Sequence, residues 1–268
     1  MAFETLLFER GEDHVATITI NRPEAMNSFN AQMLEEFDAL WDQIKADDSI
    51  HAVVLRAAMG RAFSSGADVR QAREGKGSTG VVSGSNIWNL ADPGDKLGPR
   101  RKKMWKPVVT AVHGICAGGA FYWLNESDII ICSDDAQFFD PHVTYGMTAA
   151  LEPIGARHRM PLGEVLRMTL LGNDERISAQ TALRISLVTE VVPLDRLWAR
   201  AHELAAIIAA KPPTATQGSV RAIWESLDMT RNAALDTALK YCLMGNPLGT
   251  GQVNRDAIMG APKKFDLR

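Results

Sequence analysis

A glycine-containing turn inside an apolar segment, residues 112–124, is the feature that most constrains how this chain can fold. The segment follows a mostly β-branched run at residues 108–112, contains Gly114, Gly118 and Gly119, and continues with few helix-breaking residues. This order predicts a buried strand, a glycine turn and the start of an apolar helix. A backbone N–H near Gly119 would then point outward at a helix N-terminus, where it can hold negative charge. The alternative is that the glycines only let the helix pack tightly on a sheet.

The composition is that of an ordinary globular protein. With 268 residues, of which 46% are hydrophobic and 23% charged, the chain can bury the core of one large domain, or of one domain with a small appendage. The formal net charge of -3 gives no reason to expect nucleic acid or a membrane as a partner, because both usually contact a basic face.

The three cysteines, Cys116, Cys132 and Cys242, are widely spaced. The sequence contains no C-x-x-C pair, so neither a disulfide framework nor a metal site is predicted. The first residues lack a basic and then apolar leader, and no run of about 18 apolar residues occurs. We therefore expect a cytoplasmic location.

Strand and helix patterns alternate through the first part of the chain. Residues 6–20 read as a β-hairpin, residues 31–46 as an amphipathic helix capped by Asn30, and residues 52–57 as a buried strand. This order predicts a parallel crossover, and the strand exits into a glycine loop at residues 65–68.

The remaining chain continues the alternation and then becomes helical. The patterns predict further strands at residues 107–111, 128–132, 136–139 and 187–192. They predict helices at residues 118–125, 162–171, 178–183, 197–210, 213–227 and 230–243. We therefore predict an α/β core over residues 1–193 and a helical region over residues 194–268.

Two segments between these elements have unusual composition. Residues 70–98 are rich in glycine and serine and are predicted to form a mobile lid over the site. Residues 100–103 are four consecutive cations, which form either a solvated helix face or an anion-binding rim.

The order and spacing of several short motifs resemble the enoyl-CoA hydratase/isomerase, or crotonase, superfamily. The motifs lie at residues 21–29, 62–69, 106–119, 128–130, 136–138 and 176–180. The resemblance implies a spiral of β-β-α turns as the core, with the C-terminal helices acting as a trimerisation region in a homotrimer or a dimer of trimers. It also implies an acyl-CoA thioester as substrate, with coenzyme A as part of that substrate and no separately bound cofactor.

The resemblance further implies a site built from backbone donors. The two N–H groups that would stabilise an enolate oxygen fall on Ala67 and Gly119, and two such donors form an oxyanion hole. The implied substrate and coenzyme A contacts are Ala25, Met26, Ala67, Asp68, Val69, Arg70 and Gly119. For the phosphate end of coenzyme A, cations at Arg70, at residues 100–103 or at residues 263–264 remain alternatives.

The chain departs from the family pattern where a hydratase carries its two glutamates. Tyr122 and His142 occupy these positions. His142 can act as a general base or acid, and Tyr122 can donate a hydrogen bond or a proton; the alternatives are a structural histidine and a packing aromatic. Nearby carboxylates that could take part are Asp140, Glu126 and Glu152.

We therefore expect an acyl-CoA-processing enzyme that stabilises a thioester enolate. Hydration, double-bond isomerisation, and hydrolysis of a thioester or a C–C bond remain open at this point. The rival interpretation is a non-catalytic acyl-CoA-binding protein that kept the oxyanion cradle and lost the acid and base.

Overall fold

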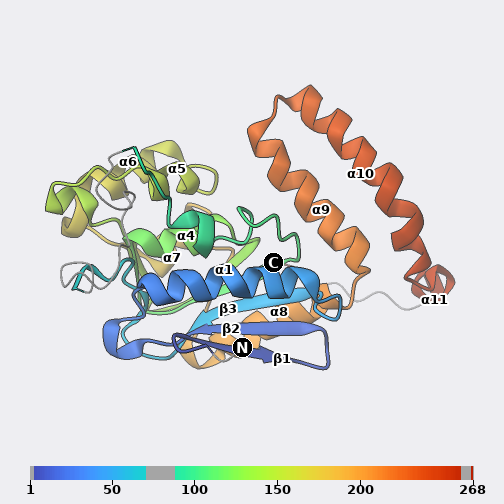
Figure 1. Ribbon diagram of the computed structural model, residues 1–268, viewed down its shortest axis with the longest axis horizontal. Helices are drawn as coiled ribbons and strands as arrows, with labels where there is room; N and C mark the ends of the chain where they lie inside the picture. Colours follow the sequence, from blue (N-terminus) through green and yellow to red (C-terminus); the bar gives the residue numbers. More distant parts are fainter. Residues whose placement is uncertain (1–2, 71–87, 261–266, 268) are drawn as a thin grey trace.

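The computed structural model describes residues 3–70, 88–260 and 267. A six-stranded sheet in the order β1-β2-β3-β5-β7-β10 forms its centre (Figure 1). The strands are β1 (Leu6–Arg10), β2 (Val15–Ile20), β3 (Ala52–Ala57), β5 (Val108–Val112), β7 (Ile129–Ser133) and β10 (Glu190–Val192). β1 pairs antiparallel with β2, which confirms the predicted hairpin, and the other pairs are parallel.

A second sheet lies at the end of the first and carries its strands in the order β4-β6-β8-β9. Its members are β4 (Ala62–Ser64), β6 (Ile115–Ala117), β8 (Gln137–Phe139) and β9 (Ile177–Ser178). β3, β5 and β7 each lead through a short turn into β4, β6 and β8, so the chain repeats one β-β unit three times. Of these four strands, β8 was predicted from the sequence, whereas β4, β6 and β9 were not.

Gly114 makes the turn from β5 to β6. Its φ is +56°, and an ideal Cβ at this position would lie 2.5 Å from the carbonyl oxygen of Arg61. Any other residue would therefore meet both backbone strain and a steric clash at this turn.

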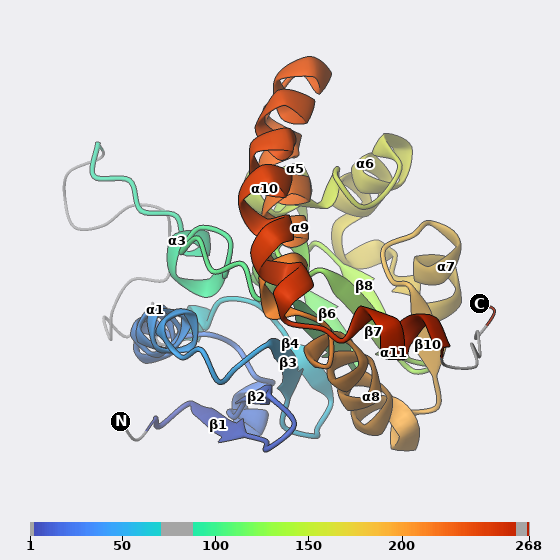
Figure 2. The same cartoon turned by 90° about the vertical axis from the view of Figure 1, so that its right-hand side faces the viewer.

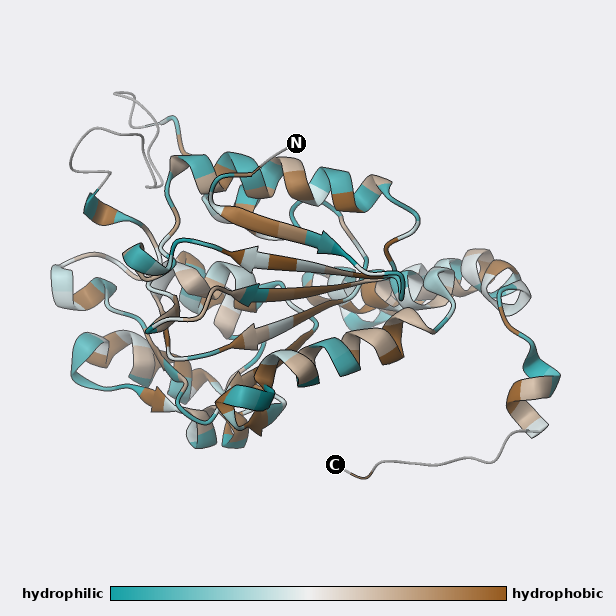
Figure 3. Ribbon diagram, turned by 90° about the horizontal axis from the view of Figure 1, so that it is seen from below, coloured by the Kyte–Doolittle hydropathy of each residue, from teal (hydrophilic) through white to brown (hydrophobic). Residues whose placement is uncertain are grey.

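Helices cover both faces of the large sheet (Figures 1 and 3). α1 (Ala31–Ala46) has the bounds predicted from the sequence, and the Asn30 side chain accepts a hydrogen bond from the N–H of Met33 at 2.9 Å, as expected of an N-cap. α1 packs on the face that carries Val53 and Leu55, whereas α8 (Leu197–Ala209) packs on the face that carries Val54.

The other helices are shorter or lie further from the sheet. They are α3 (Gly94–Leu97), α4 (Phe121–Asn125), α5 (Leu151–Ala156), α6 (Leu162–Leu171), α7 (Ala179–Arg184), α9 (Pro213–Glu225), α10 (Arg231–Gly251) and α11 (Arg255–Gly260). Single 3-10 turns are η1 (Pro23–Ala25), η2 (Gly118–Ala120), η3 (His142–Tyr145), η4 (Gly172–Asp174), η5 (Leu194–Arg196) and η6 (Ser226–Asp228).

α9 and α10 form a helical hairpin that projects from the body of the molecule (Figures 1 and 2). α10 runs eight residues beyond the predicted end at residue 243, although Pro247 lies inside it. The division between residues 193 and 194 stays a prediction, and α8, which follows it, packs directly on β3 and β5.

The run of cations at residues 100–103 is a turn, and the prediction of a solvated helix face is wrong for Arg100. The Arg100 side chain is buried and forms an ion pair with Asp128. Lys102 lies 2.8 Å from Asp38, and Arg101 lies 3.3 Å from Asp92. Carboxylates therefore neutralise at least three of the four charges locally.

Within residues 3–70 and 88–260, no helix combines the length and apolar character needed to cross a bilayer. Cys116 and Cys132 are buried free thiols, and Cys242 is exposed. The predicted lid lies mainly in residues 71–87, outside the described residues; only its ends, including α3, are described.

Phe37 gives a direct test of the core beneath α1. It is fully buried, and its ring centroid lies 5.4 Å from that of Trp123 and 5.8 Å from that of Trp41. We expect Phe37→Ala to lower the free energy of unfolding by about 3–5 kcal/mol, because it leaves a cavity between two large rings. Urea unfolding measures this loss. Leu7→Ala, on an exposed strand, is the control and should cost less than about 1 kcal/mol; equal losses would contradict this description of the core.

Candidate active site

Two glycine turns meet beside the second sheet. β4 and β6 are parallel neighbours, so the loops that follow them, residues 65–68 and 118–120, leave the sheet at the same edge. An ideal Cβ on Gly66 would lie 2.8 Å from the backbone nitrogen of Gly119, and one on Gly119 would lie 3.5 Å from the nitrogen of Ala67. The absence of side chains at both glycines thus allows the two backbone nitrogens to lie close together.

Backbone hydrogen bonds to Phe29 fix the glycine loop on either side of Ala67. Phe29 donates to the carbonyl oxygen of Gly66 at 2.9 Å and accepts from the N–H of Asp68 at 2.8 Å. In such a parallel bridge the intervening N–H, that of Ala67, points to the opposite side. Gly119 lies in the first turn of η2, where N–H groups have no intrahelical acceptor.

A buried carboxylate orients His142. Asp140 is fully buried, and its Oδ1 accepts the backbone N–H of His142 at 3.0 Å and lies 2.5 Å from the ring Nδ1. This hydrogen bond to Asp140 raises the pKa of His142, although partial burial of the ring opposes the shift. With Nδ1 held by Asp140, Nε2 is the ring atom left for chemistry.

Glu152 lies opposite that nitrogen, at the start of α5. Its Oε1 is 3.9 Å from Nε2 of His142. This separation is too long for a direct hydrogen bond but is within the span of two hydrogen bonds of about 2.8 Å through one water. Burial raises the pKa of Glu152, so its carboxyl group holds a proton more readily than an exposed glutamate.

Gly118 allows the His142 imidazole to lie beside the turn that carries the backbone nitrogen of Gly119. An ideal Cβ on Gly118 would lie 3.6 Å from Cε1 of His142 and 3.3 Å from Cδ of Pro141. The imidazole therefore lies against the backbone that leads directly into Gly119. A titratable imidazole and the two backbone nitrogens thus share one small region.

Tyr122 forms a wall of the same region. Its ring packs edge-on against Phe29, with 6.4 Å between ring centroids. Burial raises the pKa of Tyr122, and the nearby charges of Glu152 and Asp92 raise it further. The phenol therefore stays protonated and acts as a hydrogen-bond donor, with Asp92 as a partner that the sequence analysis did not identify.

Some of the residues expected to contact coenzyme A lie next to one another in the structure. The carbonyl oxygen of Met26 accepts the N–H of Ser65 at 3.1 Å, which joins the Ala25–Met26 loop to the glycine loop. Val69 and Arg70 are exposed at the rim. Residues 263–264 lie outside the described residues.

Asp68 and Glu126 are both engaged in structural contacts. Asp68 is buried, and its Oδ2 lies 2.8 Å from the Arg22 guanidinium, so this carboxylate fixes the glycine loop to the residues before α1. Glu126 accepts the backbone N–H of Arg100 at 2.6 Å and that of Arg101 at 3.2 Å, away from the imidazole. The sequence showed the Asn21-Arg22-Pro23 motif but gave no sign of this ion pair.

The ligand atoms of Asp140, His142 and Glu152 all lie within 4.8 Å of one another, so we asked whether they suit a metal ion. The hydrogen bond to Asp140 occupies Nδ1 of the imidazole. A metal at Nε2 would gain Glu152 as its one further ligand, whereas zinc sites have three or four protein ligands. The arrangement therefore suits proton transfer better.

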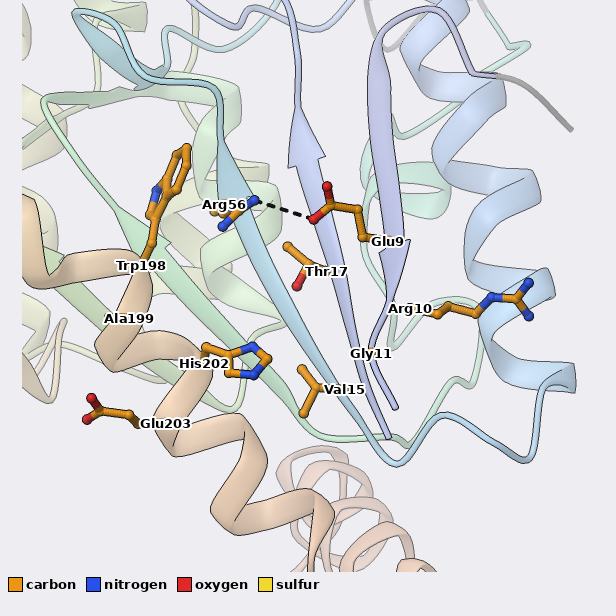
Figure 4. Close-up of a pocket in the computed structure, with 10 residues that line it drawn as sticks. All are labelled: Glu9, Arg10, Gly11, Val15, Thr17, Arg56, Trp198, Ala199, His202 and Glu203. Atoms are coloured by element: carbon orange, nitrogen blue, oxygen red, sulfur yellow. Dashed lines mark ion pairs between the residues drawn. The ribbon is translucent and has the colours of Figure 1, made fainter. Parts of the chain in front are cut away.

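Two cavities of the described structure have different lining residues. A cleft of about 520 Å³ is lined by Tyr122, Asn125 and Leu151 and so adjoins the site. A cavity of about 620 Å³ lies between β1–β3 and α8, and none of the expected site residues lines it (Figure 4). There the Arg56 guanidinium stacks 3.9 Å from the Trp198 ring centroid and pairs with Glu9, so its charge is already compensated.

The hydrogen bond between Asp140 and His142 predicts a raised pKa for His142. NMR should show one histidine with a pKa above the ordinary value of about 6.5, and Asp140→Asn should lower it. Because the charged imidazole gains its partner on folding, its stabilising contribution is complete below the unfolded pKa and is lost as pH rises through the raised folded pKa. Asp13→Asn, at the carboxylate that pairs with His202, is the control and should leave His142 unchanged. A pKa of His142 that is the same in wild type and Asp140→Asn would contradict the assignment.

Comparisons with known proteins place this geometry in a family. The enoyl-CoA hydratase/isomerase family model matches residues 10–243. The short-chain-enoyl-CoA hydratase of Clostridium acetobutylicum is 32% identical over 241 residues, covering 90% of this chain and 87% of that protein. The mitochondrial Delta(3,5)-Delta(2,4)-dienoyl-CoA isomerase of Mus musculus is 31% identical over 252 residues, covering 91% and 75%.

A solved structure gives the same result. The crystal structure of an enoyl-CoA hydratase/isomerase from Mycobacterium paratuberculosis is 37% identical to this chain, with a TM-score of 0.78 and coverage of 90% of this chain and 89% of that one. The match confirms the expected crotonase-like α/β fold. The chain belongs to the enoyl-CoA hydratase/isomerase family.

Proposed function

We propose that the protein binds an enoyl-CoA and adds water across the double bond next to the thioester. The thioester oxygen would accept hydrogen bonds from the backbone N–H groups of Ala67 and Gly119. His142, oriented by Asp140, and Glu152 would move the protons. The observation that carries the proposal is the position of the His142–Glu152 pair directly beside the Gly118–Gly119 turn.

The separation of 3.9 Å between His142 and Glu152 allows a proton-transfer cycle that returns both groups to their starting states. A water between Nε2 of His142 and the Glu152 carboxyl gives one proton to Nε2 as its oxygen attacks the β-carbon. The displaced electron pair moves to the thioester oxygen, where the two N–H groups stabilise the enolate. Glu152, whose pKa is raised by burial, gives its proton to the α-carbon. The imidazolium, stabilised by Asp140, then returns a proton to Glu152 and resets the site.

The same two groups can also support double-bond isomerisation. One group would remove a proton from one carbon of the acyl chain and the other would return a proton to another carbon, with no water added. The similarity to the dienoyl-CoA isomerase of Mus musculus favours keeping this second reaction. Tyr122 serves both reactions as a neutral donor at the wall of the site.

The test is incubation with but-2-enoyl-CoA and a dienoyl-CoA in ¹⁸O-water, followed by mass spectrometry. We expect a product that has gained one labelled water. His142→Gln and Glu152→Gln should each lower kcat by about 10²–10⁴-fold with little change in KM, because each removes a proton-transfer group. His202→Gln, at an exposed histidine, is the matched control and should be fully active.

The outcomes separate the candidate functions. Migration of the double bond without incorporation of ¹⁸O would establish the isomerase and exclude the hydratase. Saturable thioester binding with no turnover of either substrate would overturn both enzyme proposals and leave an acyl-CoA-binding protein.

We further propose that the α9–α10 hairpin mediates self-association as a trimer or a dimer of trimers. Leu235, Leu239 and Leu243 are 54%, 59% and 69% exposed, and their spacing places them on one face of α10. An exposed row of leucines on a projecting helix is typical of a protein–protein contact.

Light scattering after size exclusion tests this assembly. We expect the wild type at three or six times the chain mass, and Leu239→Asp/Leu243→Asp at the mass of one chain, because two carboxylates cannot be buried unpaired in the contact. Leu7→Asp, a charge at another exposed leucine, is the control and should keep the wild-type mass. A monomeric wild type would exclude the proposed role of α10.

A further inference from the structure

We propose that Asn125 is a positioning residue that holds Glu152 in place for proton transfer. Asn125 is the last residue of α4, and its Nδ2 donates a hydrogen bond to the backbone carbonyl oxygen of Glu152 at 2.8 Å. This inference rests on the proposed function, because it concerns how the carboxyl group proposed as the proton donor is kept opposite the imidazole.

Gly155 provides the space for this contact. An ideal Cβ on Gly155 would lie 2.3 Å from Nδ2 and 2.6 Å from Cγ of Asn125. The amide therefore occupies the place where a side chain at residue 155 would lie. One side chain of α4 thus contacts α5 near its first and its last residue.

α5 is short, and although Pro153 and Ala156 are buried, its position also depends on polar contacts such as this one. It has six residues, its N-cap residue Ala150 provides no side-chain hydrogen bond, and Leu151 and Ile154 are 38% and 63% exposed. A helix this short is not stable by itself. A second tie comes from Arg159, whose guanidinium donates to the carbonyl oxygens of Asn125, at 3.2 Å, and Ser127.

α4 connects the turn that contains Gly119 to the Asn125 contact with α5. The helix begins directly after η2, which contains Gly119, and its residues 121–124 are buried. Because α4 is buried, it fixes the distance between the N–H of Gly119 and the side-chain amide of Asn125. The contact sets where Glu152 lies relative to the thioester oxygen, and a misplacement of about 1 Å in such a site can cost about 10²-fold in rate.

The Asn125 side chain also carries a cost that packing does not explain. Among the described residues its Oδ1 is buried and has no hydrogen-bond partner. A buried acceptor without a partner lowers the stability of the fold. A side chain that served only to fill space between α4 and α5 would avoid this cost if it were apolar.

The test is a double-mutant cycle between Asn125→Ala and Glu152→Gln. We expect Asn125→Ala to lower kcat at least about tenfold with KM unchanged, and to have no further effect in the Glu152→Gln background, because it acts through Glu152. A loss of the same factor in both backgrounds would show a general structural role and overturn the proposal.

A glycine pair provides an independent variant. Gly155→Ala should displace the Asn125 amide and lower kcat, and the double variant with Asn125→Ala should match Asn125→Ala alone. Gly163→Ala in α6, where an ideal Cβ meets nothing within 4 Å, is the matched control and should leave kcat unchanged. Full activity of Gly155→Ala would overturn the proposed contact.

An NMR measurement that does not depend on catalytic turnover tests this inference independently of the proposed function. Movement of Glu152 should change the Cε1–H resonance of His142, so Asn125→Ala and Glu152→Gln should each shift it, with no additional shift in the double variant. If Glu152→Gln is fully active, the catalytic role of Glu152 is wrong. The resonance then still decides whether Asn125 positions Glu152, and an unshifted resonance in Asn125→Ala would show that it does not.

Discussion

The close approach of two glycine turns is the constraint on which the rest of this structure depends. Gly66 and Gly119 allow the backbone nitrogens that follow β4 and β6 to come together, since a Cβ at either position would strike the other turn or Phe29. The parallel pairing of β4 with β6 makes the two turns neighbours. The two sheets, the buried face of α1 and the packed helix α4 hold this meeting point in place.

The chemistry around that point follows from burial. Asp140 is buried with one oxygen shared between the backbone N–H and the ring of His142, so the carboxylate both orients the imidazole and favours its charged form. Burial acts in the opposite sense on Glu152, because it raises the pKa of the carboxyl group and so favours its neutral form. Two groups with different environments thus face each other across 3.9 Å, which is the arrangement that acid–base catalysis needs.

Much of the fold could be predicted because local patterns determine it. The bounds of α1 and α6, the cap Asn30, and the strands of the large sheet follow from period and capping chemistry. The strands β4, β6 and β9 and the helix α5 were not predicted, because their conformation depends on partners distant in sequence. The buried position of Arg100 was missed for the same reason, since Asp128 lies 28 residues away.

The sequence by itself determined the family, the two glycine turns, and the presence of Tyr122 and His142 where glutamates were expected. It also named Asp140 and Glu152 as neighbours to consider. Only the tertiary structure decided that Asp140 binds His142, that Glu152 faces Nε2, and that the carboxylates of Asp68 and Glu126 serve structural contacts. The physical reason is that sequence spacing fixes which residues share an element, whereas a hydrogen bond such as that from Asn125 to Glu152 requires two elements to pack in one particular way.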